Sequence, residues 1–321
     1  MMTTARKQQI SVDVTPYYHC VSRCVRRSFL CGVDPLTDQN YEHRRDWIEQ
    51  KIYALSQVYC IDICAYAIMS NHYHLVIHIN RDKAQALSDY EVVERWQQDH
   101  KLPALIERWL SGQLASDIEK EACIAIINSW RARLWNLSWF MKELNFDIAC
   151  QANREDECRG HFWESRFKSQ ALLDEQALVA AMAYVDLNPL RAGVATTPET
   201  SEFTSIRARL EALNHQQETA SCLHPFIGNL TNSKLDGIPF RLMDYIELVD
   251  WTARQYREGK ACLNITSPPI LQRLNINQSN WLRACTELEK HRSSAVGCIQ
   301  DLRAVKNALN KQRIQLFRLD G

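Results

Sequence analysis

Two histidines separated by one residue begin an alternating segment, HYHLVIHI, that spans residues 72–79. Alternate side chains of a strand share a face, so His72 and His74 lie together, with Val76 and His78 further along the same face. Two imidazoles whose Cα atoms are about 6–7 Å apart can converge on one cation. An isolated pair of this kind is also compatible with exposed or hydrogen-bonded histidines.

A tyrosine and an asparagine stand four residues apart in the segment AYVDLNPLRAG, residues 183–193. On a helix, Tyr184 and Asn188 would lie one above the other on one face. Taken singly, each could be an ordinary core-edge residue or a cap. Together they offer a hydroxyl nucleophile and a neutral oxygen ligand on one short rigid element, and a metal-bound phosphate could lie between this helix and the histidines.

Mixed strands and helices are predicted around these residues. The strands are expected at 16–23, 59–69, 72–79 and 161–169, with a hairpin turn at Ser70-Asn71. Helical spacing covers 46–58 and 83–144, and a further helix begins at the N-cap residue Asp174 and should stop at Asn188, before Pro189. This order predicts an α+β fold with helices covering one face of the sheet.

After about residue 195 the chain becomes polar and then helical again. Residues 244–260 have an amphipathic repeat, and the last 40 or so residues look helical and charged. We therefore predict a catalytic domain at 1–195, with a helical insertion at about 83–145, and a mainly helical C-terminal extension at 196–321 of unknown role.

The motifs resemble those of the REP-associated tyrosine transposases, a family of single-tyrosine HUH endonucleases. The hairpin AIMSNHYHLVIHI is similar to the HUH motif, in which two histidines flank a bulky residue, here Tyr73. The segments YYHCVSRCVRRSFLCG, HFWESRFKS and AYVDLNPLRAGV are similar to the matching segments of the family and follow in the same order. The resemblance covers most of residues 15–195.

The resemblance implies a ferredoxin-like (RRM-like) antiparallel sheet and a divalent metal, Mg²⁺ or Mn²⁺. It implies His72, His74 and Asn188 as metal ligands and Tyr184 as the nucleophile. It also implies cleavage of single-stranded DNA at hairpin-forming repeats (repetitive palindromic elements) and strand transfer. The chain departs from the family in its long insertion and in His78, a third imidazole on the metal-side face.

The expected chemistry suits these residue types. A tyrosine nucleophile would form a covalent 5′-phosphotyrosine and leave a free 3′-hydroxyl, so strand transfer proceeds in two steps. Tyrosine is a weak nucleophile with a pKa near ~10, and a hard cation on the phosphate would offset the developing charge. Two histidines and an amide suit Mn²⁺, and Mg²⁺ less naturally. The sequence offers no clear general base for Tyr184.

Basic residues flank these segments and are the candidate DNA contacts. They are Arg23, Arg26, Arg27, Arg166, Lys168 and Arg191. Arg166 and Lys168 are expected to alternate onto one face of their strand. Single strands need cationic tracks and stacking rings, and aromatic residues lie close in sequence to these charges. A solvated basic surface is the alternative interpretation of each residue.

The formal net charge is zero, so composition gives no support to nucleic-acid binding, and the case for it depends on local sites. The chain has no run of ~18 apolar residues and no signal-peptide core at its start, so we expect a cytoplasmic, nucleoid-associated protein without membrane contact. Its 12 cysteines form no C-x-x-C pair, which favours buried free thiols. The sequence does not determine the oligomeric state, and a homodimer is one assembly that it allows.

Two other functions compete with an active transposase-like nuclease. One is a domesticated, catalytically inactive protein that only binds hairpin DNA. The other is a metallohydrolase that uses His72, His74 and His78 with a bound water and needs no tyrosine. Covalent trapping of DNA would separate the nuclease from both.

Overall fold

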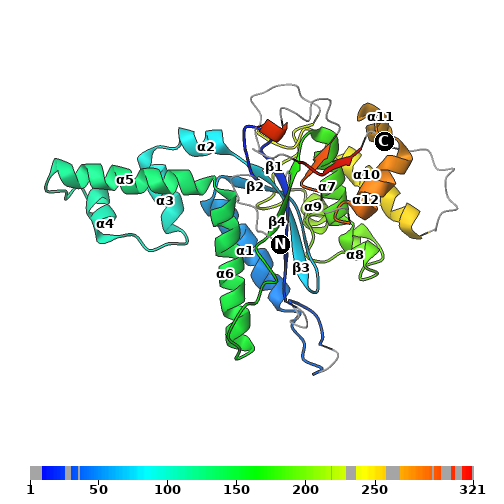
Figure 1. Cartoon of the computed structure of the whole chain (residues 1–321), viewed down its shortest axis with the longest axis horizontal. Helices are drawn as coiled ribbons and strands as arrows, with labels where there is room; N and C mark the ends of the chain where they lie inside the picture. Colours follow the sequence, from blue (N-terminus) through cyan, green and yellow to red (C-terminus); the bar gives the residue numbers. More distant parts are fainter. Residues whose placement is uncertain are drawn as a thin grey trace.

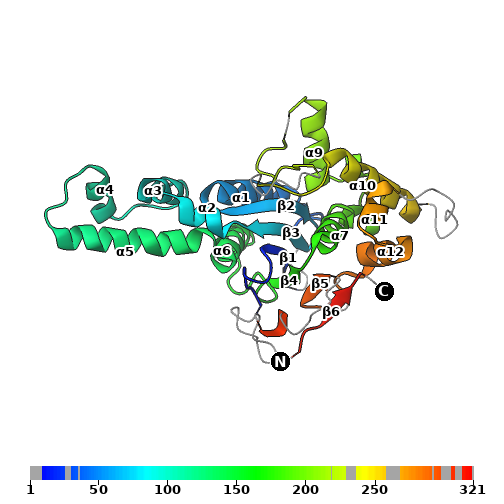
Figure 2. The same cartoon turned by 90° about the horizontal axis from the view of Figure 1, so that it is seen from above.

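A six-stranded sheet lies at the centre of the described part of the protein (Figures 1 and 2). The computed structural model describes residues 9–25, 30–34, 37–217, 219–228, 236–257, 268–290, 293–297, 305–307 and 313–319. The strand order is β2-β3-β1-β4-β5-β6. The strands are β1 (Tyr17–Arg23), β2 (Ile61–Ile68), β3 (His72–Ile79), β4 (Lys168–Leu172), β5 (Ala295–Gly297) and β6 (Leu316–Arg318). The fold is therefore mixed α+β, as the sequence predicts.

The sheet is antiparallel in its first four strands only. β3 pairs with β2 and β1, and β1 pairs with β4, all antiparallel. β5 and β6 are added in parallel orientation at the far edge. The expectation of a wholly antiparallel sheet is therefore wrong at this edge. Parallel pairing requires a long connection, and the helices between β4 and β5 supply one.

Helices cover both faces of the sheet, so the expectation of one covered face is wrong. On one face, Tyr73, Leu75 and Ile77 of β3 belong to the core that includes helices α1 (Arg44–Val58) and α6 (Leu137–Glu155). On the other face, Val76 packs in a second core with α7 (Glu175–Asp186). The nearly continuous apolar sequence of β2, IDICAYAI, suits a strand that is buried on both faces.

The expected insertion is mainly helical, and part of it forms an arm. It contains α2 (Arg81–Ala86), α3 (Asp89–Gln97), α4 (Ala104–Leu110), α5 (Asp117–Leu134) and α6. Figures 1 and 2 show that α3, α4 and α5 extend away from the sheet, whereas α6 lies beside α1. Within the described residues, no helix is both long and apolar enough to span a bilayer.

The helix that carries the tyrosine begins where the sequence predicts. The carboxylate of Asp174 accepts a hydrogen bond from the backbone N–H of Ala177 at 2.7 Å, so it caps the N-terminus of α7. α7 ends at Asp186, and the short helix α8 (Asn188–Arg191) follows, with Pro189 in its first turn. Asn188 therefore begins a new helix, and Leu187 alone separates it from the last residue of α7.

The strand expected at 161–169 is displaced toward the C-terminus. β4 spans 168–172, and of the preceding residues Trp163 makes only an isolated bridge to Cys24. The indole N–H of Trp163 donates to the backbone oxygen of Asn145 at 2.7 Å. This aromatic segment therefore contacts α6 and does not extend the sheet. Arg166 lies before β4, so the predicted alternation of Arg166 and Lys168 along one strand is wrong.

The chain after residue 195 adds to the same sheet and to the second core. Its helices are α9 (Ser205–Asn214), α10 (Leu242–Arg257), α11 (Pro269–Arg273) and α12 (Gln278–Glu287), with the 3₁₀ turn η2 (Pro198–Thr200) before them. Tyr245, Leu248 and Trp281 share the core of α7. The cysteines within the described residues are free thiols, most of them buried, which agrees with the prediction.

Candidate active site

The predicted histidine, tyrosine and asparagine side chains meet on the α7 face of the sheet. The amide nitrogen of Asn188 donates to Nε2 of His74 at 2.7 Å. The Tyr184 ring lies 5.9 Å from the His74 ring, centroid to centroid, and the His72 ring lies 4.8 Å from it. His74 is fully buried, and Tyr184 and Asn188 are nearly so. One chain therefore brings all four residues together.

His19 belongs to this group, although no motif in the sequence identifies it. It lies in β1, where its partner in the register is Val76, between His74 and His78 on β3. Its Nε2 lies 3.0 Å from Nδ1 of His74, and the two rings are stacked. Tyr17, His19 and Val21 alternate along β1, so their side chains share one face of the sheet. This pattern places His19 beside His74 only if β1 is known to pair with β3.

A chain of hydrogen bonds fixes the tautomer of His74, and it starts at Gln170 in β4. The Gln170 amide nitrogen donates to Leu288 O, Ser293 O and Ser293 Oγ at 3.1, 3.1 and 2.7 Å. Its Oε1 therefore accepts from Nδ1 of His19, at 2.7 Å. His19 Nε2 must then accept from Nδ1 of His74, which leaves Nε2 of His74 with its lone pair.

His72 is held in the same tautomer by a different partner. Its Nδ1 lies 2.6 Å from the side-chain oxygen of Asn71, which can only accept. His72 Nδ1 therefore carries the hydrogen, and Nε2 carries the lone pair. Both predicted metal-binding histidines thus present an unprotonated Nε2, each oriented by a hydrogen bond at Nδ1, as is usual for metal-bound histidines.

The electrostatics of the site keep both imidazoles neutral. Burial, together with the nearby charges of Arg23 and Arg191, lowers the pKa of His72 to about 3. Burial and the neighbouring His72 and His19 lower the pKa of His74 well below its usual value. A neutral imidazole is the form that binds a metal. Two Nε2 atoms and the side-chain oxygen of Asn188 therefore fit a divalent cation. To bind it, the Asn188 amide would rotate, because its nitrogen donates to Nε2 of His74 in this structure.

Glu289 is a second residue of the site that the sequence motifs do not include. It follows α12, and its carboxylate lies 3.5 Å from the Tyr184 hydroxyl, which donates to it, and 3.8 Å from Nδ1 of His74. Burial, and next the charge of Glu289, raise the pKa of Tyr184 to about 12. The hydroxyl is therefore protonated at neutral pH, with a carboxylate in position to accept its proton. No sequence motif connects Glu289 with Tyr184, since 105 residues separate them.

Three of the predicted DNA-binding cations surround His72. Arg23, Arg191 and Lys168 each lie close enough to lower its pKa, and Arg23 is its register partner on β1. The Arg191 guanidinium lies 3.9 Å from the centroid of the Tyr184 ring and donates to the backbone oxygens of Tyr184 and Cys285. This group of positive charges can attract a phosphate.

The other three predicted DNA contacts are Arg166, Arg26 and Arg27. Arg166 is exposed and precedes β4. Arg26 and Arg27 lie outside the described residues. His78 is not part of this site, because its side chain lies with Asp62 and His224 in a separate cluster.

The sequence matches no family model and no curated protein. One solved structure, described as the REP-associated tyrosine transposase bound to a REP hairpin, is 11% identical to this chain. That similarity covers 73% of this chain and 97% of the other, with a TM-score of 0.35. At that TM-score the similarity does not by itself define the fold or the function of this chain.

Proposed function

We propose that this protein is a metal-dependent endonuclease and strand transferase for single-stranded DNA, with Tyr184 as its nucleophile. The observation that carries the proposal is the contact of Tyr184, His74 and Asn188 in one buried site, beside the carboxylate of Glu289. The order of the sequence motifs supports the same function.

In the proposed reaction, the oxygen of Tyr184 attacks the phosphorus of a phosphodiester and the bond to the 3′-oxygen breaks. The phenol proton passes to Glu289, and the departing 3′-oxygen takes a proton from solvent. A divalent metal bound by His72, His74 and Asn188 would neutralise charge on the phosphate. Arg191, which stacks on the Tyr184 ring, would hold the ring and add positive charge beside the phosphate.

The substrate that this site favours is a single strand or a hairpin of a repetitive palindromic element. The chain has no net charge, so general attraction to DNA is small and binding depends on the local cations Arg23, Lys168 and Arg191. Both the histidines and the tyrosine come from one chain, so a homodimer would not be needed to complete the site.

A second candidate function is a protein that binds hairpin DNA without cutting it. The burial of Tyr184 favours this alternative, because only 6% of the residue is exposed. Glu289 and Arg191 cover it, and Glu289 comes from the C-terminal region. For cleavage, these side chains must move far enough to admit a phosphate.

One experiment separates the two candidates. Full-length protein is incubated with labelled single-stranded hairpin DNA and Mn²⁺ and then denatured, and a covalent adduct is sought on a denaturing gel. We expect an adduct with the wild-type protein and with Tyr73→Phe, a control on the opposite face of the sheet, but none with Tyr184→Phe. An adduct with Tyr184→Phe would exclude Tyr184 as the nucleophile. Hairpin binding without any adduct would favour the inactive protein.

The same assay tests the metal. Cleavage should stop in excess chelator and in the His72→Ala and His74→Ala variants, and it should weaken in Asn188→Ala. Full activity in chelator would exclude a metal-dependent reaction.

A further inference from the structure

A second cluster of histidine and aspartate side chains lies near the other end of β3. It consists of Asp62 from β2, His78 from β3, and His224 and Asp236 from the segments between α9 and α10, and their ligand atoms all lie within 4.8 Å of one another. Four residues of a strand separate His78 from His74, or about 13 Å. The cluster is therefore distinct from the candidate active site.

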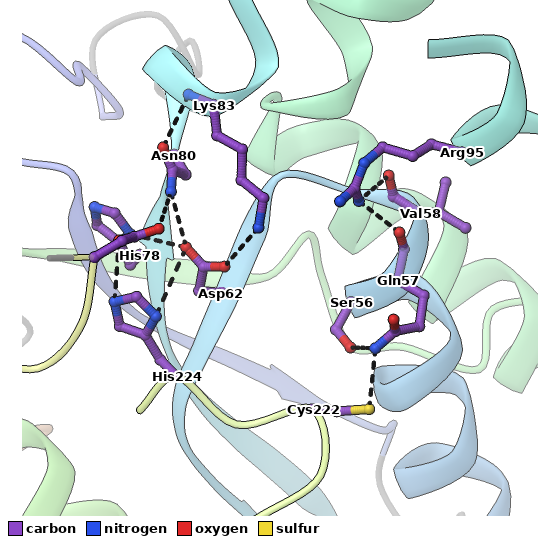
Figure 3. A network of polar contacts seen from close by, with 11 residues as sticks. Ser56, Gln57, Val58, Asp62, His78, Asn80, Lys83, Arg95, Cys222 and His224 are labelled. Atoms are coloured by element: carbon purple, nitrogen blue, oxygen red, sulfur yellow. Dashed lines mark hydrogen bonds and ion pairs between the residues drawn. The ribbon is translucent and has the colours of Figure 1, made fainter. Parts of the chain in front are cut away.

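The four side chains converge on a small volume. Nδ1 of His78 lies 3.0 Å from Asp62 Oδ2 and 3.9 Å from Asp236 Oδ1. Nε2 of His224 lies 3.6 Å from Asp236 Oδ1, and its Nδ1 lies 3.9 Å from Asp62 Oδ2. Figure 3 shows His78, Asn80, Lys83 and His224 turned toward the Asp62 carboxylate.

The backbone holds these side chains in place. Asp62 and His78 are register partners in the hairpin. The backbone N–H of His224 donates to Ile63 O at 2.8 Å, and the Arg209 guanidinium donates to His224 O. A bridge between Phe226 and Ile238 positions the chain next to Asp236. Backbone contacts therefore position Asp62, His78 and His224 directly, and the chain that follows Asp236 is paired as well.

One nitrogen in this cluster lacks a hydrogen-bond partner. Only 4% of His224 is exposed, and its Nε2 is buried without a partner. Its nearest ionic neighbour is the Asp236 oxygen at 3.6 Å, which is beyond an ordinary hydrogen bond. A buried polar atom without a partner is costly, so the atom points to something that would bind there.

Neighbouring polar groups orient the carboxylates. The amide of Asn80 donates to Asp236 Oδ2 at 2.6 Å and to Asp62 Oδ2 at 3.4 Å. Nζ of Lys83 lies 3.8 Å from Asp62 Oδ1, on the other oxygen of that carboxylate. Such outer contacts are typical of carboxylates that bind metals.

We infer that Asp62, His78, His224 and Asp236 form a second divalent-metal site, for Zn²⁺ or a metal of similar chemistry. Two imidazoles and two carboxylates are four ligands of the kind that Zn²⁺ takes, and the nitrogen pair disfavours Mg²⁺ and Ca²⁺. The metal closes the segment after α9 onto the end of the β2–β3 hairpin. This site gives a structural role to His78, the third histidine of β3, which the proposed reaction does not use.

Metal binding by the full-length protein tests the site. Chelator-stripped protein is titrated with Zn²⁺ against a chromophoric competitor, and separately with Co²⁺, whose visible absorption reports the geometry of its ligands. We expect tight Zn²⁺ binding and tetrahedral Co²⁺ absorption in the wild-type protein. His224→Gln and Asp236→Asn should weaken binding at this site by at least about 100-fold, because loss of an outer contact alone costs 10–100-fold.

Control variants keep the result independent of the proposed nuclease. His43→Gln, whose imidazole pairs with Glu155 elsewhere, should leave Zn²⁺ binding unchanged. His72→Ala removes a ligand of the candidate active site, and it should still retain the tight Zn²⁺ binding that His224→Gln and Asp236→Asn weaken. Asp236 has a half-exposed side chain, so Asp236→Asn should fold even if His224→Gln does not. Unchanged Zn²⁺ affinity in both site variants, or no Zn²⁺ binding by the wild-type protein, would overturn the inference.

Discussion

At the scale of single residues, the candidate active site depends on its histidines and also on the groups that fix their tautomers by hydrogen bonds. Asn71 fixes the tautomer of His72, and Gln170 fixes that of His74 through His19. Gln170 is itself oriented by the backbone of Leu288 and Ser293. The C-terminal region therefore determines which nitrogen of His74 is free.

Replacement of Gln170 should show this effect. In Gln170→Leu the Nδ1 hydrogen of His19 loses its acceptor, so the tautomer of His74 is no longer imposed. We expect cleavage to need 10–100-fold more Mn²⁺, with little change in hairpin affinity. Gln176→Leu is a matched control, since Gln176 also donates to a C-terminal backbone oxygen, that of Leu274, but lies in the first turn of α7. Equal Mn²⁺ requirements for the two variants would contradict the tautomer argument.

A pH profile should reveal the role of Glu289. The pKa of Tyr184 is raised to about 12, so at pH 7 only roughly one hydroxyl in 10⁵ is ionised. With Glu289 accepting the proton, the wild-type cleavage rate should change little between about pH 6.5 and 9. In Glu289→Gln the rate should be lower, and it should rise about tenfold per pH unit, because the reaction then waits for the phenolate. Parallel profiles for the two proteins would exclude Glu289 as the base.

At the scale of elements, the sequence predicts those features that depend only on neighbouring residues. The span of β3 and the N-cap at Asp174 follow from alternation and from a single side chain. The pairing of β1 with β3 and the position of Glu289 depend on contacts far apart in the chain, so neither could be read from a motif. The strand predicted at 161–169 failed because Phe162 and Trp163 have strand propensity but pack in the core beside α6.

A buried carboxylate joins the tyrosine helix to the elements that follow it. Asp186, the last residue of α7, accepts hydrogen bonds from the Ser205 hydroxyl, the Ile206 N–H and the Tyr245 hydroxyl. It is fully buried, and burial raises its pKa despite these bonds. Asp186 therefore needs each of its donors and couples α7 to α9 and α10.

Removal of one donor should destabilise the protein measurably. Tyr245→Phe leaves a buried oxygen of Asp186 without its partner, which costs about 1–3 kcal/mol. Urea denaturation would measure the change in the free energy of unfolding. Tyr41→Phe, which removes an exposed hydroxyl that donates to Gln39, should change it by less than about 0.5 kcal/mol. A loss for Tyr245→Phe no larger than for Tyr41→Phe would mean that Asp186 does not couple these helices.

At the scale of the whole molecule, the sheet and the second core continue across residue 195. β5 pairs with β4, and α12 packs against α7. The C-terminal region also supplies Glu289 and the two oxygens that orient Gln170. The sheet, the second core and the candidate active site therefore all include residues that the sequence predicts to be a separate extension.

A chain that ends at residue 235 tests this dependence. It lacks α10, α12, β5 and β6, so the apolar face of α7 loses Tyr245, Leu248 and Trp281 as neighbours. Each such side chain contributes about 1.5–3 kcal/mol by burial, and a whole domain is stable by only about 5–15 kcal/mol. We expect the shortened chain to be insoluble or to unfold without a cooperative transition, and residues 236–321 supplied as a second chain to restore folding. A soluble, cooperatively unfolding chain would show instead that the first 235 residues form an independent unit. If that unit still cut DNA, its rate should rise with pH as in Glu289→Gln, because the carboxylate beside Tyr184 would be gone.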